Sequence, residues 1–247
     1  MIIHYSDHAP SERLQDFVFT FWKTQNTSGT HSQYTIFPDA GIEWICSILP
    51  NQPPRINIFG LSTHGLEITI PDQAVLFGVR FKLLAVEYLL KTTLPANSSQ
   101  ELNYPERFEL STQTSLDAFV EIISVQLQEQ LHSLSIDPRK QKLLDWVYRS
   151  KGAISVQQLA LETGWAARQI NRYFTTTFGL PLKEYLEQLA FFSSLPQIGA
   201  GDFYPQGYYY DQSHFIRQTK KHTGNTPKQL YQQRNVRFIQ LGDDYNE

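Results

Sequence analysis

The chain has 247 residues, of which 41% are hydrophobic and 18% are charged, and its formal net charge is −3. This length is enough for two ordinary domains, each with its own core. A single cysteine, Cys46, excludes an intramolecular disulfide bond and a cysteine-based zinc site. No basic-then-apolar signal pattern begins the chain and no apolar run approaches ~18 residues, so we expect a cytoplasmic protein rather than a membrane-spanning one.

Charge is divided unevenly along the chain. Residues 1–138 hold 7 Lys and Arg against 15 Asp and Glu, whereas residues 139–235 hold 13 against 6. The last twelve residues hold 1 against 3. An acidic half joined to a basic half is typical of a sensing or dimerising module beside a nucleic-acid-binding module.

The first half is rich in β-branched and aromatic residues separated by Pro and Gly. Residues 34–37 lead into the turn Pro38-Asp39-Ala40-Gly41 and then into residues 42–48, a pattern that predicts a β-hairpin. In Leu14–Trp22 the apolar residues fit both helical spacing and alternation, and we predict a helical turn that enters a strand. Further strands are expected at residues 56–61, 66–70 and 74–81.

After about residue 83 the pattern becomes helical. A short helix is expected at Ala85–Lys91 and a long one at Leu116–Leu134, whose apolar stripe is either a dimer face or a cover for the domain. Asp137-Pro138 is typical of a capped helix start. We therefore predict an α+β N-terminal domain over residues 1–136, antiparallel and β-rich with C-terminal helices. An all-α domain over residues 137–235 and a tail over residues 236–247 follow it.

Residues 155–174 have the spacing of two short helices joined by a tight turn. Ser155 can cap the first helix, whose inward face holds Leu159 and Ala160. Gly164 follows Ala160 by four residues, where a left-handed backbone ends a helix at low steric cost. Ala160 has to be small, because the second helix crosses the first there. The pattern predicts a helix-turn-helix.

The second helix of this pair, expected at about 166–177, has two different faces. Ile170, Tyr173 and Phe174 stand at i, i+3 and i+4 and return the helix to the core. The opposite face carries side chains that can read base edges and hold phosphates, namely Arg168, Gln169, Asn171 and Arg172. Double-stranded DNA is therefore the leading predicted partner.

Further motifs lie after the predicted helix-turn-helix, in residues 211–230. Residues 211–217 and 220–230, taken together with Ile154–Leu186, resemble the C-terminal domain of AraC-type (AraC/XylS) transcriptional regulators. That family carries two helix-turn-helix units joined by a long linker helix. Phe178-Gly179-Leu180-Pro181 and Thr223-Gly224-Asn225-Thr226-Pro227 resemble the paired motifs that close its recognition helices. The N-terminal half resembles an accessory domain of some of these regulators, in the pieces Phe17-Val18, Phe21-Trp22, Phe37-Pro38-Asp39, Gly41-Ile42-Glu43, Phe59-Gly60 and Gly78-Val79-Arg80-Phe81.

The resemblance implies a double helix-turn-helix domain with base contacts from two helices. In the first unit the implied readers are Arg168, Asn171 and Arg172. In the second unit, with a helix at about 211–222, they are Gln212, Ser213, His214 and Arg217. An arginine can bridge guanine O6 and N7, and Asn or Gln can bridge adenine N6 and N7. Phosphate contacts, which set affinity without choosing sequence, are expected from Lys183, Lys220 and Lys221.

The second unit departs from the family's pattern ahead of its recognition helix. Tyr204 and Tyr208 stand where a small residue and a glycine are usual, with Pro205 between them, and proline inside a helix costs ~3 kcal/mol. Pro196 and residues 199–201 are expected to interrupt the short connection that follows Leu186. Thr219 takes the place of a core aromatic. We predict that the recognition helix is kept while its supporting helix is truncated or rebuilt as an aromatic loop.

Asp39, Glu43 and Arg80 are the only group that suggests acid–base chemistry. A structural role is the simpler interpretation, with Asp39 bonded to the backbone of its own turn and Glu43 paired with Arg80 across two strands. The chain has no nucleophile–base spacing, phosphate-binding glycine loop or metal motif. We therefore expect no catalytic activity, no cofactor and no metal.

The aromatic residues of the first half allow two interpretations. They could line a small-molecule pocket, but ordinary strand packing explains the same stripe. These residues are Trp22, Phe37, Trp44, Phe59, Phe77 and Phe81.

The sequence as a whole predicts a sequence-specific DNA-binding transcriptional regulator. The alternative is a ligand-sensing or protein-interaction adaptor that has lost specific DNA binding. Besides double-stranded DNA, the candidate partners are a small-molecule effector in the N-terminal domain, RNA polymerase and a second copy of the chain.

Overall fold

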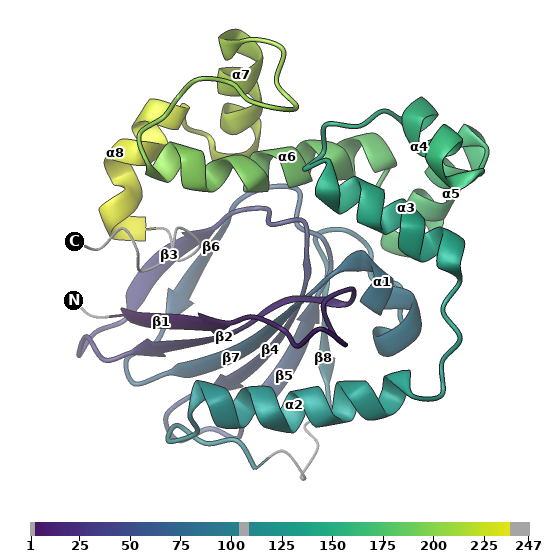
Figure 1. Cartoon of the computed structure of the whole chain (residues 1–247). Coiled ribbons are helices and arrows are strands. Elements are labelled where there is room, and N and C mark those ends of the chain that lie inside the picture. The colour runs from purple at the N-terminus through teal and green to yellow at the C-terminus, as the bar shows by residue number, and fades with distance from the viewer. Residues whose placement is uncertain (1–2, 104–108, 238–247) are drawn as a thin grey trace.

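The computed structural model describes residues 3–103 and 109–237, an antiparallel β-rich part followed by helices (Figure 1). The strands are β1 (Ile3–His8), β2 (Val18–Asn26), β3 (Ser32–Ile36), β4 (Ile42–Ile48), β5 (Arg55–Phe59), β6 (Leu66–Ile70), β7 (Val75–Phe81) and β8 (Ser99–Leu102). The helices are α1 (Leu83–Ala85), the π-helix η1 (Val86–Leu90), α2 (Leu116–Leu131), α3 (Pro138–Arg149), α4 (Val156–Thr163), α5 (Ala167–Phe178), α6 (Leu182–Gly199), α7 (Gln212–Thr223) and α8 (Pro227–Arg237). The last two residues of α8 fall within the predicted tail, and residues 238–247 lie outside the described residues.

Six strands form one antiparallel sheet in the order β1-β2-β7-β4-β5-β8. The strands expected at residues 56–61, 66–70 and 74–81 are confirmed as β5, β6 and β7. The helical turn expected before β2 is also confirmed, because the amides of Phe17 and Val18 both donate to the Leu14 carbonyl at 2.9 Å.

The hairpin predicted between residues 34–37 and 42–48 is wrong. β3 pairs instead with β6 in a separate two-stranded sheet, and β4 pairs with β5 and β7. The turn between them carries the chain from one sheet to the other, with Ala40 in a left-handed conformation at φ 56°. Alternation identified both strands correctly, but it could not identify their partners.

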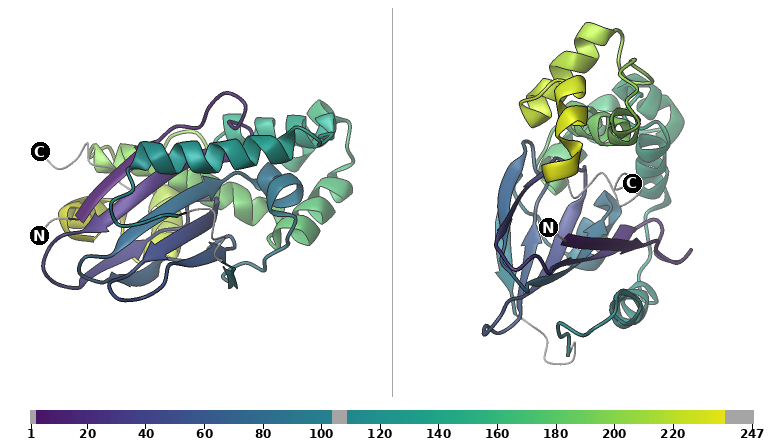
Figure 2. Two further views of the ribbon diagram at one scale, coloured as in Figure 1. Left: turned by 90° about the horizontal axis from the view of Figure 1, so that it is seen from below. Right: turned by 90° about the vertical axis from the view of Figure 1, so that its left-hand side faces the viewer.

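Side chains alternate along the strands of the six-stranded sheet, so each strand presents side chains to both faces of the sheet. On β7, Phe77 faces α2, where its ring lies 5.0 Å from that of Phe119. Gly78 points the other way, and a Cβ added there would meet the Trp22 ring at 2.0 Å, so this position has to be glycine. Helix α2 runs along the sheet (Figure 2) and buries Phe119, Ile123 and Leu127, which confirms that its apolar stripe covers the domain.

The C-terminal helices are arranged along α6. Figure 1 shows α6 running between the α3–α5 group at one end and α7 with α8 at the other. The prediction that Pro196 interrupts this segment is wrong, since α6 continues through it to Gly199. Pro196 lies in the last turn, where it removes only one hydrogen bond, and its carbonyl still accepts from the Ala200 amide at 2.9 Å.

One hydrophobic cluster connects the β-rich part with the helices that follow it. It includes residues of β2, β7, α2, α3, α5 and α6, such as Phe21, Phe119, Val147, Phe174 and Tyr185. A second cluster is made by residues of α6, α7 and α8 and includes Phe37, the residue that follows β3. The domain boundary near residue 136 stays a prediction, because the apolar core crosses it.

We expect the substitution Phe119→Ala to lower the free energy of unfolding by about 3–5 kcal/mol. Phe119 is fully buried and contacts Phe21, Trp44 and Phe77, so the smaller side chain leaves a cavity between α2 and the sheet. Urea denaturation measures the change. Val125→Ala, at a position of α2 that is 52% exposed, is the control and should alter stability by less than about 0.5 kcal/mol.

Candidate nucleic-acid interface

Local hydrogen bonds define both ends of α4, the second of which is the tight turn into α5. The Ser155 hydroxyl accepts from the Gln158 amide at 3.2 Å, and the Gln158 side chain accepts from the Ser155 amide at 2.9 Å. Gly164 ends α4 in a left-handed conformation with φ 70°, and its amide donates to the Ala160 carbonyl at 3.0 Å. A residue with a side chain would be strained at that φ, which explains why the chain has glycine there.

The two faces of α5 are as the spacing predicted. Ile170, Tyr173 and Phe174 are buried against the core. Arg168, Asn171 and Arg172 are exposed, and within the described residues their side chains make no hydrogen bond or ion pair. Three polar groups able to bind DNA are thus held on one helix without an internal partner.

Gln169 has a local role that the sequence analysis missed. It is exposed on α5, and its side-chain oxygen accepts from the Ala166 amide at 3.0 Å, which caps the start of the helix. The position of Gln169 three residues after Ala166, the residue that precedes α5, was a signal for such a cap.

Helix α5 contacts the β-rich part of the chain through the Glu87 carboxylate on η1. The Tyr173 hydroxyl donates to Glu87 at 3.0 Å, and Lys140 of α3 forms an ion pair with the same carboxylate. The Lys140 ammonium also lies 5.3 Å from the centre of the Tyr173 ring. Burial, followed by the charge of Glu87, raises the pKa of Tyr173, so the phenol stays protonated and remains a donor.

Helix α7 presents a second set of polar side chains. Gln212, Ser213, Arg217 and Lys220 are exposed on it. Lys221 is also exposed but forms an ion pair with Glu187 of α6 at 2.6 Å. His214 is half-buried against the rings of three tyrosines, Tyr208, Tyr209 and Tyr210.

The segment ahead of α7 is a loop, as predicted. Residues 200–211 contain no helix, and Asp211 caps α7 by accepting from the His214 amide at 2.7 Å. Tyr209 is buried in the second hydrophobic cluster, whereas Tyr204 and Tyr210 are exposed. Thr219, expected in place of a core aromatic, is fully buried, and its hydroxyl donates to the Phe215 carbonyl at 2.9 Å.

A cavity of about 340 Å³ lies between the β3–β6 sheet and the end of α7. Its lining residues include Thr35, Phe37, His64, Glu67, His222 and Asn225. His222 is buried and stacks on Phe191 with ring centres 4.8 Å apart. Burial, assisted by the neighbouring Lys221 charge, lowers the pKa of His222 to about 4, so this ring is neutral near pH 7.

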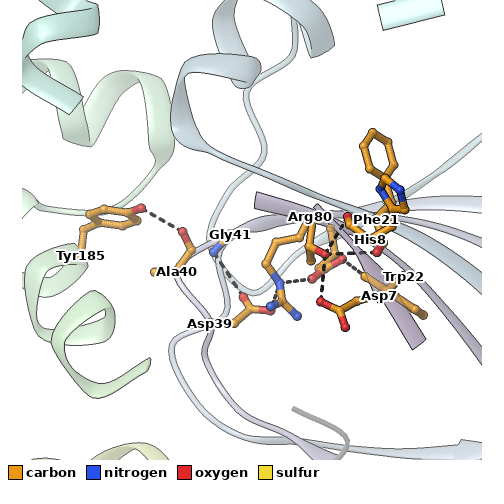
Figure 3. Close-up of polar contacts among 11 residues, drawn as sticks. Asp7, His8, Phe21, Trp22, Asp39, Ala40, Gly41, Arg80 and Tyr185 are labelled. Atoms are coloured by element: carbon orange, nitrogen blue, oxygen red, sulfur yellow. Dashed lines mark hydrogen bonds and ion pairs between the residues drawn. The ribbon is translucent and has the colours of Figure 1, made fainter. Parts of the chain in front are cut away.

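Asp39, Glu43 and Arg80 form an ion cluster, of which Asp39 and Arg80 are labelled in Figure 3. The Arg80 guanidinium lies 2.6 Å from Glu43 and 2.9 Å from Asp39, and the three side chains are between 7% and 14% exposed. Glu43 stands opposite Arg80 across β4 and β7, and Asp39 accepts from the Gly41 amide at 3.2 Å. Both structural roles expected from the sequence are thereby confirmed.

The ion cluster adjoins α6. The Tyr185 hydroxyl of α6 donates to the Ala40 carbonyl at 2.9 Å (Figure 3), and the Arg80 guanidinium lies 5.3 Å from the centre of the Phe192 ring. Burial raises the pKa of Glu43 to about 7, with Arg80 opposing the shift and Asp39 adding to it.

The aromatic residues proposed as pocket or core serve mainly as core. Phe77 and Phe81 are buried in the first cluster, and Phe37 packs edge-on against Phe191 with ring centres 6.1 Å apart. Trp22 is 8% exposed and donates to Glu43 at 3.0 Å. Of the six residues, only Phe37 also lines the cavity beside α7.

The free energy of unfolding should depend on pH through Glu43. Between its ordinary pKa of 4.5 and about 7, the folded chain holds this proton while the unfolded chain releases it. The stabilising contribution is therefore complete below pH 4.5 and is lost as the pH rises to about 7. In urea denaturation across this window, Glu43→Gln should show a smaller fall in stability than the wild type. Glu121→Gln, an exposed position on α2, is the control, and a fall of equal size in E43Q and the wild type would contradict the assignment.

Comparisons with known proteins match the β-rich part of the chain by sequence and most of the chain by structure. The family model described as a domain of unknown function, DUF6597, matches residues 6–102, within the β-rich part. No curated protein matches the chain. The crystal structure of ToxT from Vibrio cholerae O395 is similar at 12% identity with a TM-score of 0.44, covering 81% of this chain and 96% of that chain.

Two further ToxT structures are similar to the chain. An apo variant from Vibrio cholerae strain SCE256 has 10% identity and a TM-score of 0.46, covering 91% of this chain and 98% of that chain. Wild-type ToxT from the same strain, bound to an unsaturated fatty acid, has 11% identity and a TM-score of 0.41, covering 93% of this chain and 94% of that chain. Within the described residues, no helix is long and apolar enough to cross a membrane, and no group of three or more His, Cys, Asp or Glu is placed to hold a metal ion. The assignment of function therefore depends on the geometry of the helices.

Proposed function

We propose that the chain is a sequence-specific DNA-binding transcriptional regulator of the AraC type, with α4 and α5 as its first helix-turn-helix. The observation that carries this proposal is the outward face of α5. Arg168, Asn171 and Arg172 are exposed there without an internal partner, on a helix whose other face is buried. A helix held in this way can enter a major groove and place its polar side chains at base edges.

The charge of the helical half supports the same partner. Residues 139–235 carry 13 Lys and Arg against 6 Asp and Glu, so this half attracts a polyanion although the whole chain is acidic. Arg217 and Lys220 of α7 add exposed cations at the other end of α6. In this proposal α5 and α7 are two recognition helices and α6 is the linker that spaces them.

The two units contribute unequally. On α5 both arginines are without an internal partner among the described residues, whereas on α7 Lys221 is paired with Glu187 and His214 is covered by tyrosines. We therefore assign base readout mainly to Arg168, Asn171 and Arg172. Gln212, Ser213 and Arg217 are secondary readers, and Lys220 is a phosphate contact.

The other parts of the chain fit a regulatory role. The ion cluster of Asp39, Glu43 and Arg80 has each charge paired within the cluster, so we assign it to structure and assign no catalysis to the chain. The cavity beside α7 is the candidate place for a small-molecule effector, because both halves of the chain line it. RNA polymerase and a second copy of the chain remain candidate partners.

The adaptor alternative is favoured by one observation. The second unit lacks a leading helix, since residues 200–211 form a loop, and this loss could end specific DNA binding. The alternative and the proposal differ in whether the full chain selects particular duplexes.

We expect Arg172→Ala to weaken binding to the preferred duplex by about 1–3 kcal/mol, because one bidentate guanine contact is lost. The preferred duplex is first selected from a random pool with the full chain. Fluorescence anisotropy then gives Kd for the wild type and R172A at one fixed salt concentration. The affinity of the wild type should also fall steeply as salt is raised.

Arg55→Ala is the matched control, because Arg55 is an exposed arginine on β5 of the large sheet. It should bind the selected duplex as the wild type does. If R172A also binds as tightly as the wild type, the role of α5 is refuted. If the full chain selects no duplex at low salt, the adaptor alternative is supported instead.

A further inference from the structure

The aromatic loop ahead of α7, residues 200–211, has contacts within itself and with α6 and α8. The Asp202 carboxylate accepts from the Tyr204 amide at 3.0 Å, and the Gln197 side chain donates to the Tyr204 carbonyl. Phe203 packs edge-on against Tyr231 with ring centres 5.6 Å apart. Figures 1 and 2 show this loop beside α7, at the end of the molecule away from the large sheet.

Tyr210 is 93% exposed. Its ring stacks on that of His214, with centres 5.5 Å apart and planes at 24°. Its amide lies 3.4 Å from the His214 ring nitrogen Nδ1, and the next residue, Asp211, caps α7. The ring contact with His214 restricts this exposed side chain, which lowers the conformational entropy that it loses when a partner binds it.

Tyr210 lies next to the start of α7, so both can contact the same partner. It comes two residues before Gln212 and on the loop that stands where a leading helix would cross the DNA backbone. Arg217 and Lys220, exposed on the next turns, carry the positive charge that holds a duplex there. Tyrosine hydroxyls are among the groups that commonly bond phosphate oxygens.

We propose that the Tyr210 hydroxyl donates a hydrogen bond to a phosphate oxygen of the duplex that α7 enters, and so positions the second unit where its leading helix is missing. This inference rests on the DNA-binding function proposed above. Within the described residues the hydroxyl makes no hydrogen bond, so it is available to a partner. Stacking on a base is the weaker role for this ring, because duplex bases must first be unstacked at a cost of a few kcal/mol.

The test is Tyr210→Phe, which removes the hydroxyl and keeps the ring on His214. We expect Kd to rise about tenfold, the effect of losing one hydrogen bond to a charged group. The rise should be equal on the selected duplex and on an unrelated one, because phosphates carry no sequence information. The dependence of log Kd on log salt should stay unchanged, whereas Lys220→Ala, at the phosphate contact of α7, should reduce its slope by about one.

Two outcomes would overturn the inference. Y210F could bind as the wild type does, or it could lose affinity only for the selected duplex. In the first case, a loss of affinity in Tyr210→Ala would assign the contact to the ring. Tyr34→Phe, a half-buried tyrosine on β3, is the control and should leave Kd unchanged.

R172A is measured in the same series so that the two proposals can fail separately. If R172A weakens binding and Y210F does not, only the role of Tyr210 fails. If the wild type binds no duplex, the DNA-binding function and the role of Tyr210 fail together.

Discussion

Ile170, Tyr173 and Phe174 are buried along one side of α5, and this burial decides which side chains the helix can offer to a partner. Each fully buried side chain of this size contributes about 1.5–3 kcal/mol by leaving water. Turning the helix to expose them would cost more than any single polar contact returns. The outward direction of Arg168, Asn171 and Arg172 is therefore a consequence of packing, and it does not require DNA to be present.

The same packing ties α5 to the β-rich part of the chain. Tyr173 is buried on α5 and donates to Glu87 on η1, and Lys140 completes the contact from α3. Three elements from both halves thus share one carboxylate. A change in the β-rich part that moved η1 would therefore alter the contacts that hold α5. Tyr185 makes a comparable contact from α6 to the turn before β4.

The features that could be predicted from the sequence are those determined by local chemistry. Ser155 and Gly164 identify the start and end of α4 through capping and left-handed geometry, and the faces of α5 follow from helical spacing. The β3–β6 pairing could not be predicted, because alternation describes the faces of a strand and not its neighbours. The contact between Tyr173 and Glu87 joins residues 86 positions apart, and nothing in either local pattern points to the other.

In the proposed function, α5 and α7 would contribute differently to affinity and to selectivity. Base readout contributes about 1–3 kcal/mol for each good pair, whereas phosphate contacts act on every sequence alike. If α5 reads bases and α7 mainly holds the backbone, a mismatch under α5 costs more than one under α7. The acidic half, with 15 Asp and Glu against 7 Lys and Arg, repels a duplex that approaches from the sheet. Selectivity then comes from one helix, while the opposing charges of the two halves orient the duplex before any base is read.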